Sequence, residues 1–157
     1  MSAPIKVSKA AHASFEGEAW NALIDLISGN DPEELTPVQR TAHLAWVCSS
    51  EVLNGGHDQY FGNQEHLDHR EVISALTVPG AVRQSEILKE ALNYFARAQQ
   101  EMPDDYEQYV AWDKHYGYGA RMIEFDQRFY DCRPEIETEL LEAYRGANES
   151  EFITWIS

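Results

Sequence analysis

The densest group of residues that could support chemistry lies between Gly56 and His69. His57, His66 and His69 fall in this segment together with several carboxylates, and nitrogen and oxygen donors of this kind suit zinc or non-haem iron. The spacing argues against a metal site, because His66 and His69 flank the start of a predicted helix and do not share a face as HExxH ligands do. The sequence therefore predicts a polar turn here, with no metal ion and no other cofactor.

Other patterns of catalytic residues are equally weak. Asn54-Gly55-Gly56 lacks the lysine and the preceding strand of a phosphate-binding loop, and the chain has no GxSxG motif. Cys48 and Cys132 are isolated thiols that we expect to be ordinary buried side chains in a reducing compartment. These features predict a protein that is not an enzyme and that resides in the cytoplasm.

The elements that would position these residues are helices. Apolar side chains recur at helical spacing along most of the chain, and strand signals are weak. The predicted helices cover residues 15–27, 36–53, a short stretch from Asp68 to the break at Pro79-Gly80, 81–96, 106–114, 120–131 and 134–145. The sequence therefore predicts an all-α fold, a single compact multi-helix domain of roughly six to eight helices.

The long second helix has clear start and stop signals. Thr36-Pro37-Val38-Gln39 has the pattern of a capping box with proline at the first helical position. Asn54-Gly55-Gly56 is expected to end this helix, because glycine tolerates the left-handed conformation. We expect a second short helix to follow, in which Tyr60 and Phe61 bury their rings against the long helix.

The chain ends suggest a simple domain organisation. Residues 1–14 are rich in Ala, Ser and Lys and predict a flexible N-terminal tail. Residues 15–157 predict a single all-helical domain without a dividing linker. The apolar segment 151–156 is expected to dock on this domain or to pack across a two-fold interface.

The chain is strongly acidic, with 27 Asp and Glu against 12 Lys and Arg and a net charge of −15 over 157 residues. This charge argues against direct binding to nucleic acid or to an anionic membrane through a broad basic face. A hydrophobic content of 43% argues against a disordered acidic tail. Residues 101–157 carry a net charge of −9 and residues 1–100 carry −6, so the acidity is concentrated towards the C-terminus.

Two groups of carboxylates are candidates for a binding surface. The first, the acidic stripe, is Glu135, Glu139 and Glu142 at i, i+4 and i+7 of the last predicted long helix. Such neighbours lie about 5–6 Å apart at their Cβ atoms, comparable to successive phosphates of a DNA strand. No Lys or Arg falls between residues 134 and 144, so we expect an unpaired stripe. An ordinary solvated helix face remains an equal alternative.

The second group, the acidic tip, consists of Asp104, Asp105 and Glu107 where a loop enters a helix. Here an ordinary role in helix capping competes, because the helix dipole favours carboxylates in the first turn. Glu124, with Arg121 before it and Arg128 after it, is expected to be ion-paired and lies outside the candidate surface.

The segment from residue 54 to residue 63 carries the most specific motif. Its positions Asn54, Gly55, Gly56, Gln59, Tyr60, Phe61 and Asn63 resemble the NGG-x-x-QYF-x-N signature of the DMP-type DNA-mimic protein family. The resemblance spans residues 36–144, and His57 stands where the family pattern usually has an aromatic residue. It implies an all-helical homodimer whose carboxylates imitate DNA phosphates, and the spacing of the acidic stripe and the acidic tip makes them the candidate partner-binding residues in this sequence. The implied partner is a basic DNA-binding protein such as a transcriptional regulator.

Two alternatives share this composition. An immunity or antitoxin-like inhibitor of a basic nuclease would use the same electrostatics. A generic acidic helical domain of a salt-adapted organism would also be acidic, and the scarcity of lysine, four against eight arginines, agrees with that. An enzyme built on the three histidines is the least favoured interpretation.

Overall fold

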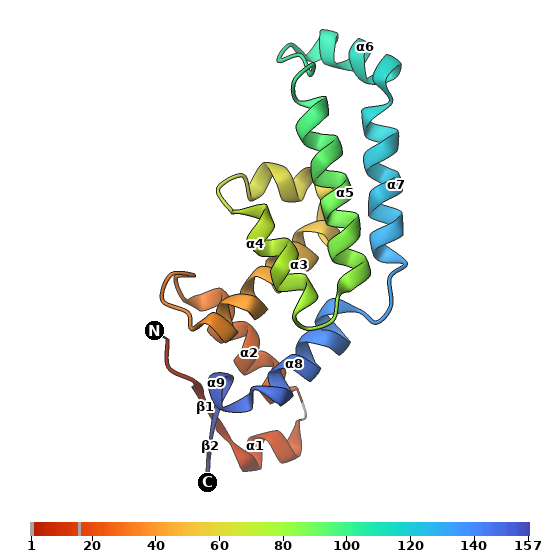
Figure 1. Cartoon of the computed structure of the whole chain (residues 1–157). Helices are drawn as coiled ribbons and strands as arrows, with labels where there is room; N and C mark the ends of the chain where they lie inside the picture. Colours follow the sequence, from red (N-terminus) through yellow and green to blue (C-terminus); the bar gives the residue numbers. More distant parts are fainter. Residues whose placement is uncertain (1, 16) are drawn as a thin grey trace.

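A computed structural model describes residues 2–15 and 17–157 and is almost entirely helical (Figure 1). The elements in chain order are β1 (Ile5–Ser8), α1 (Lys9–Ser14), α2 (Glu18–Gly29), α3 (Pro37–Asn63), α4 (His69–Thr77), α5 (Val82–Ala98), α6 (Tyr106–Tyr116), α7 (Tyr118–Tyr130), the π-helical turn η1 (Ile136–Leu141), α8 (Glu142–Ala147), α9 (Glu149–Phe152) and β2 (Ile153–Ile156). The predicted all-α class is confirmed. Within the described ranges, every helix falls short of the length and hydrophobicity that a membrane span requires.

Helix α3 is the central element, and it packs against α2, α4, α7 and η1. The predicted capping box is present, because the Thr36 hydroxyl accepts from the Gln39 N–H (3.3 Å) and the Gln39 side chain accepts from the Thr36 N–H (2.9 Å). One side of α3 is fully buried, with Ala42, Ala45 and Cys48 at 0% exposure. The helix therefore provides the buried surface against which the other helices of the core pack.

The predicted stop at Asn54-Gly55-Gly56 is a kink between two helical segments of α3. Gly56 has φ +80°, a left-handed conformation that side-chain-bearing residues rarely adopt. The segment after the kink buries Tyr60 and Phe61, with 0% and 2% exposure, as expected. Phe61 stacks on Phe95 of α5 with ring centroids 4.7 Å apart, so the kink directs these rings into the core.

Helices α5 and α7 run side by side as an antiparallel pair, and α6 lies across their far end (Figure 1). Helix α6 has no buried residue. Aromatic contacts join it to the neighbouring helices: the ring of Tyr116 lies 6.0 Å from that of Tyr94 on α5, and the ring of Trp112 lies 5.8 Å from that of Tyr118 on α7. Thus α6 projects from the body of the molecule as an exposed end.

The two chain ends lie side by side and correct the expectation of a flexible tail over residues 1–14. Strand β1 pairs in parallel with β2, with Ile5 opposite Ile153, and Val7 is buried at 5% exposure. Helix α1 places His12 against Trp155, with 5.0 Å between ring centroids. The predicted docking of the C-terminal segment is confirmed, and the segment that it pairs with is the N-terminal one.

The predicted continuous helix over residues 134–145 is also corrected. The structure instead has η1 followed by α8, with Glu135 at the N-cap of η1 in an extended conformation. This division, together with the short helices α1 and α9, gives the described chain more helices than the six to eight expected.

Candidate functional site

The acidic tip lies on α6 and the loop before it, at the projecting end of the molecule. Asp104, Asp105 and Glu107 are all exposed. Asp105 is the N-cap of α6, since its carboxylate accepts from the Gln108 N–H (3.0 Å). One of the three carboxylates therefore has a structural role, whereas Asp104 and Glu107 form no ion pair within residues 2–15 and 17–157.

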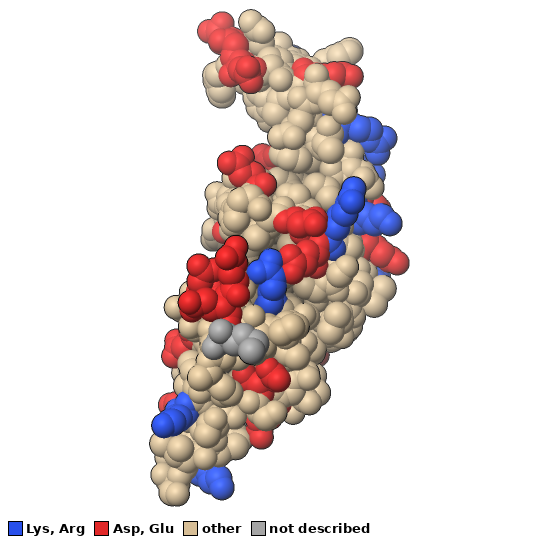
Figure 2. Space-filling model, turned by 60° about the vertical axis from the view of Figure 1, so that its left-hand side comes forward, with Lys and Arg blue, Asp and Glu red and all other residues tan. Residues whose placement is uncertain are grey.

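An exposed apolar surface accompanies these carboxylates. The Tyr106 side chain is 77% exposed and Val110, one helical turn later, is 48% exposed. In Figure 2, acidic side chains gather at the upper end of the molecule, where α6 lies in Figure 1. The tip therefore offers negative charge and apolar contact area together, a combination that suits a protein partner with a basic surface.

The acidic stripe differs from its sequence-based description. Because η1 and α8 replace the expected regular helix, Glu135, Glu139 and Glu142 do not lie on one α-helical face. The Glu139 carboxylate turns back to accept from the Glu135 N–H (2.7 Å). It thereby satisfies a free backbone donor at the start of η1.

The expectation that the stripe is unpaired is wrong for two of its three members. Glu135 forms an ion pair with Arg133 (3.3 Å), and Glu142 forms one with Arg145 (2.5 Å). Both arginines lie just outside residues 134–144, the range in which the sequence lacks basic residues. Part of the negative charge of the stripe is therefore neutralised within the chain.

The structure does not bring the two acidic groups together. The tip lies on α6, beyond the far end of α5 and α7, whereas η1 and α8 follow the opposite end of α7 (Figure 1). Helix α7 has 13 residues and is therefore about 20 Å long. Tip and stripe are thus separate patches.

The expected pairing of Glu124 is confirmed with one partner and corrected for the other. Arg121 pairs with Glu124 (2.5 Å), whereas Arg128 reaches across to Glu90 of α5 (2.7 Å). The guanidinium groups of both arginines also lie over the Phe125 ring, 4.7 and 5.7 Å from its centroid. This α5–α7 surface is neutralised locally.

The signature motif has a clear structural role in the polar network around Glu51. The side-chain amides of Gln59 and Asn63 both donate to the Glu51 carboxylate (2.8 and 2.9 Å), and Gln64 adds a third contact (3.3 Å). These hydrogen bonds hold the pKa of Glu51 below its usual range, and the one from Gln59 has the largest effect. The network joins the two segments of α3 across the kink.

We expect Glu51→Ala to lower the free energy of unfolding by about 1 kcal/mol at pH 7, since two amide groups lose a charged acceptor at a partly exposed site. The pKa of Glu51 is lower in the folded protein than its usual value. The carboxylate therefore stabilises the fold above its usual pKa, and this stabilisation is lost as the pH falls through the pKa of the folded state. Urea midpoints of the variant and the parent protein should therefore converge below about pH 4. Glu65→Ala, at an exposed carboxylate in the next turn, is the control. An unchanged difference at low pH would contradict this role.

A second network at the kink involves His57 and was missed by sequence reasoning. The carboxylate oxygen Oδ1 of Asp126 accepts from the His57 backbone N–H (2.8 Å) and lies 2.7 Å from the His57 Nδ1. A Cβ atom at Gly56 would lie 2.3 Å from the other carboxylate oxygen. The signature glycine is therefore needed both for its positive φ and for the close approach of Asp126 from α7.

The three histidines have separate surroundings. His57 is fully buried beside Phe129, with 5.4 Å between ring centroids, whereas His66 is exposed. His69 contacts the Tyr60 hydroxyl through Nδ1 (3.0 Å). In the part of the chain that the structure describes, no group of three His, Cys, Asp or Glu side chains could hold a metal ion. Cys48 and Cys132 are both buried, as expected.

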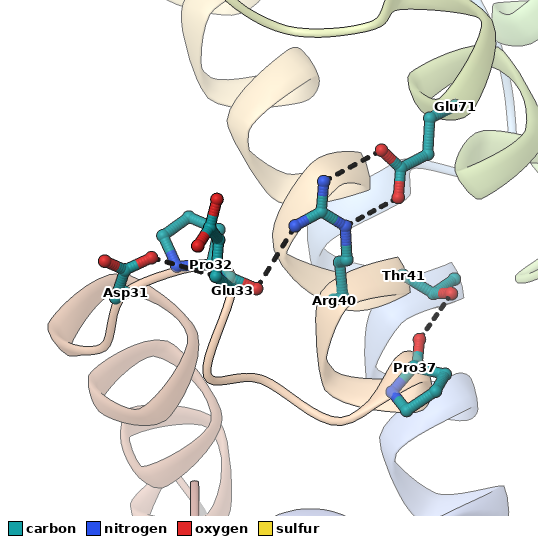
Figure 3. Close-up of polar contacts among 7 residues, drawn as sticks. All are labelled: Asp31, Pro32, Glu33, Pro37, Arg40, Thr41 and Glu71. Carbon is teal, nitrogen blue, oxygen red and sulfur yellow. Dashed lines mark hydrogen bonds and ion pairs between the residues drawn. The ribbon is translucent and has the colours of Figure 1, made fainter. Parts of the chain in front are cut away.

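Sequence reasoning also missed an acidic loop between α2 and α3. Asp31, Glu33 and Glu34 are exposed, and the run Asp-Pro-Glu-Glu was the available signal. Figure 3 shows Asp31 accepting from the Glu33 N–H (2.9 Å). Arg40 donates to the Pro32 carbonyl (3.2 Å) and, through two nitrogens, to Glu71 (2.6 and 2.8 Å). Arg40 thereby anchors the loop on α3 while the carboxylate of Glu33 stays in solvent.

Comparison with protein-family models confirms the resemblance seen in the sequence. A model described as DMP19-like protein matches residues 33–148, a range that includes the signature motif, the acidic tip and the acidic stripe. Comparisons with curated proteins and with solved structures found no match. Because the match extends over well more than half of the 157 residues, the chain belongs to the DMP19-like protein family.

Proposed function

We propose that this chain is a non-enzymatic DNA mimic that binds the DNA-binding surface of a basic protein, such as a transcriptional regulator, in competition with DNA. Membership of the DMP19-like family and the net charge of −15 support the proposal. The proposed location is the cytoplasm, and the proposed form is a homodimer, which would double the charge and lengthen the acidic surface. The proposal includes no cofactor, no membrane and no direct contact with nucleic acid.

The observation that carries the proposal is the acidic tip. Asp104, in the loop before α6, and Glu107, in the first turn of α6, are both exposed, and no ion pair in the described chain neutralises them. Helix α6 packs Trp112 and Tyr116 against the core, but it leaves Tyr106 and Val110 in solvent beside these carboxylates. This combination favours a role for α6 in recognition.

The spacing of the acidic patches suits a DNA-binding surface. The tip and the stripe lie beyond opposite ends of α7, which is about 20 Å long. One strand of duplex DNA carries about six phosphates over that length. A partner that contacts several phosphates along one strand could therefore contact both patches, with the tip as the better anchor because two of the stripe carboxylates are already paired.

Capture of partners over a salt series tests the proposal. The immobilised protein should retain a nucleic-acid-binding protein from the source lysate at about 50 mM salt. It should release that protein before the salt reaches 1 M, because salt screens the attraction and the Debye length falls to about 3 Å at 1 M. Duplex DNA carrying the binding site of the captured protein should compete for it. Failure to capture any nucleic-acid-binding protein, or capture that DNA does not displace, would contradict the proposal. A captured nuclease would instead identify the chain as a nuclease inhibitor.

A further inference from the structure

A small pocket lies where α3, the end of α7 and η1 meet. Its volume is about 220 Å³, and its walls include Phe129, Cys132 and Ile136, which are 3–4% exposed. Leu53 also lines it and is 53% exposed, so apolar contact area is available to an incoming group. Pockets for drug-sized ligands usually measure about 300–1,000 Å³, and this one suits a single extended side chain.

Two carboxylates line the pocket, and Glu137 is the more buried of them. Burial raises the pKa of this carboxyl group, and the Ser49 hydroxyl beside it acts in the opposite direction. Both residues line the pocket, and Ser49 is 1% exposed. Glu137 has no ion pair with any described Lys, Arg or His, whereas the neighbouring Glu135 is paired with Arg133. The pocket thus contains a half-buried carboxylate without an ion pair, because the one arginine in its lining, Arg133, is paired with Glu135 and largely exposed.

The backbone of η1 accounts for this unusual position. Ile136 and Leu141 of the π-helical turn are buried, at 3% and 0% exposure, and fix it on the core. Glu137 lies between them and lines the pocket, in contrast to Glu139, which bonds to the backbone of Glu135. Single π-helical turns occur frequently at functional sites.

Apolar walls beside the unpaired Glu137 carboxylate favour an amphipathic cation as the occupant. The aliphatic stems of Lys and Arg bury themselves against apolar side chains, and their charged heads need a partner when they leave water. A neutral apolar group would fill the walls but would leave the Glu137 carboxylate without a cationic partner. An anionic group would face both Glu135 and Glu137 across the same pocket.

We propose that this pocket receives one Lys or Arg side chain of the basic protein partner, whose charged head binds the Glu137 carboxylate. The identity of the occupant as a partner side chain rests on the proposed DNA-mimic function; the preference of the pocket for an amphipathic cation does not. Glu137 then acts as a specificity residue beside the acidic stripe, because it recognises an inserted side chain rather than a surface charge.

A titration of the full-length protein with butylguanidinium, followed by amide NMR, tests the pocket without the partner. The amides of Ser49, Leu53 and Ile136 should show the largest shifts, and pentanol, which lacks the charge, should shift them far less. Glu137→Gln should weaken butylguanidinium binding about tenfold or more, since a charge-assisted contact is lost. Asp131→Asn, which removes an exposed carboxylate just before the pocket residue Cys132, is the matched control and should bind as the parent does.

Two results would overturn the inference: equal binding by Glu137→Gln and the parent protein, or shifts concentrated at α6 and the α2–α3 loop rather than at the pocket. The Glu137→Gln variant is isosteric and removes a charge whose burial is unfavourable, and a far-UV circular dichroism melt verifies that it folds. The outcome is independent of partner capture. If butylguanidinium binds but no partner is captured, the pocket inference stands and the mimic function is rejected. If a partner is captured but butylguanidinium does not bind, the mimic function stands and the pocket inference is rejected.

Discussion

Asp126→Ala should lower the free energy of unfolding by about 3–5 kcal/mol, because this carboxylate is the acceptor for two groups of a buried residue. The His57 side chain is 0% exposed and the Asp126 side chain only 16%. Removal of the carboxylate leaves the His57 backbone N–H and its Nδ1 without a partner in an aromatic environment. A loss of this size is a large part of the total stability of a typical domain, about 5–15 kcal/mol.

Urea unfolding followed by circular dichroism measures the effect, with the slope of the transition verified to be unchanged. Asp131→Ala removes the same charge from the exposed residue that follows α7, and it should stay within about 0.5 kcal/mol of the parent protein. Equal midpoints for the two variants would show that Asp126 does not hold the kink of α3 against α7.

A second substitution separates the backbone and side-chain parts of this contact. His57→Phe keeps the backbone N–H donor to Asp126 and fills the same aromatic surroundings, so it should cost less than Asp126→Ala. It also introduces the residue class that the family pattern usually has at this position. The double variant then gives the side-chain coupling, which is about 0.5–3 kcal/mol for residues in direct contact.

The start and the kink of α3 could be predicted from sequence because their signals are local. The Thr36 capping box spans four residues, and the Gly55-Gly56 pair forces a change of direction whatever it packs against. The burial of Tyr60 and Phe61 follows from their helical spacing after that kink. Each of these features depends on residues within one or two turns of the chain.

The features that sequence reasoning missed depend on contacts between distant residues. Asp126 reaches His57 over 69 positions, and β1 pairs with β2 at opposite ends of the chain. A four-residue strand has too weak a local signal to be seen without its partner. The N-terminal segment therefore had the sequence pattern of a tail, although its partner lies in the C-terminal segment.

The acidic stripe shows a different limit of sequence reasoning. Residues 134–144 contain no Lys or Arg, but Arg133 and Arg145, just outside this range, pair with Glu135 and Glu142. Helical spacing was also the wrong geometry, because η1 begins at Ile136 and leaves Glu135 in an extended conformation. The acidic tip is better defined, since Asp104 and Glu107 have no such neighbours within the described residues.

The double charge reversal Asp104→Lys with Glu107→Lys should therefore weaken binding to a captured partner by about 100-fold or more, equivalent to about 2.8 kcal/mol. Two attractive contacts with a basic surface become repulsive, and the slower encounter adds to this loss. Asp105 is left in place, because it caps α6 and its removal would destabilise the helix by about 1 kcal/mol. Isothermal titration calorimetry at two salt concentrations measures the affinity and its salt dependence.

Two comparison variants make this result specific to the tip. Asp25→Lys with Glu86→Lys changes the net charge by the same amount at exposed positions of α2 and α5, and it should weaken binding much less, through long-range charge alone. Glu135→Lys with Glu142→Lys tests the stripe and should have an intermediate effect, because its carboxylates are already shared with Arg133 and Arg145. Equal losses for all three variants would mean that the partner responds to net charge and that α6 provides no localised binding surface.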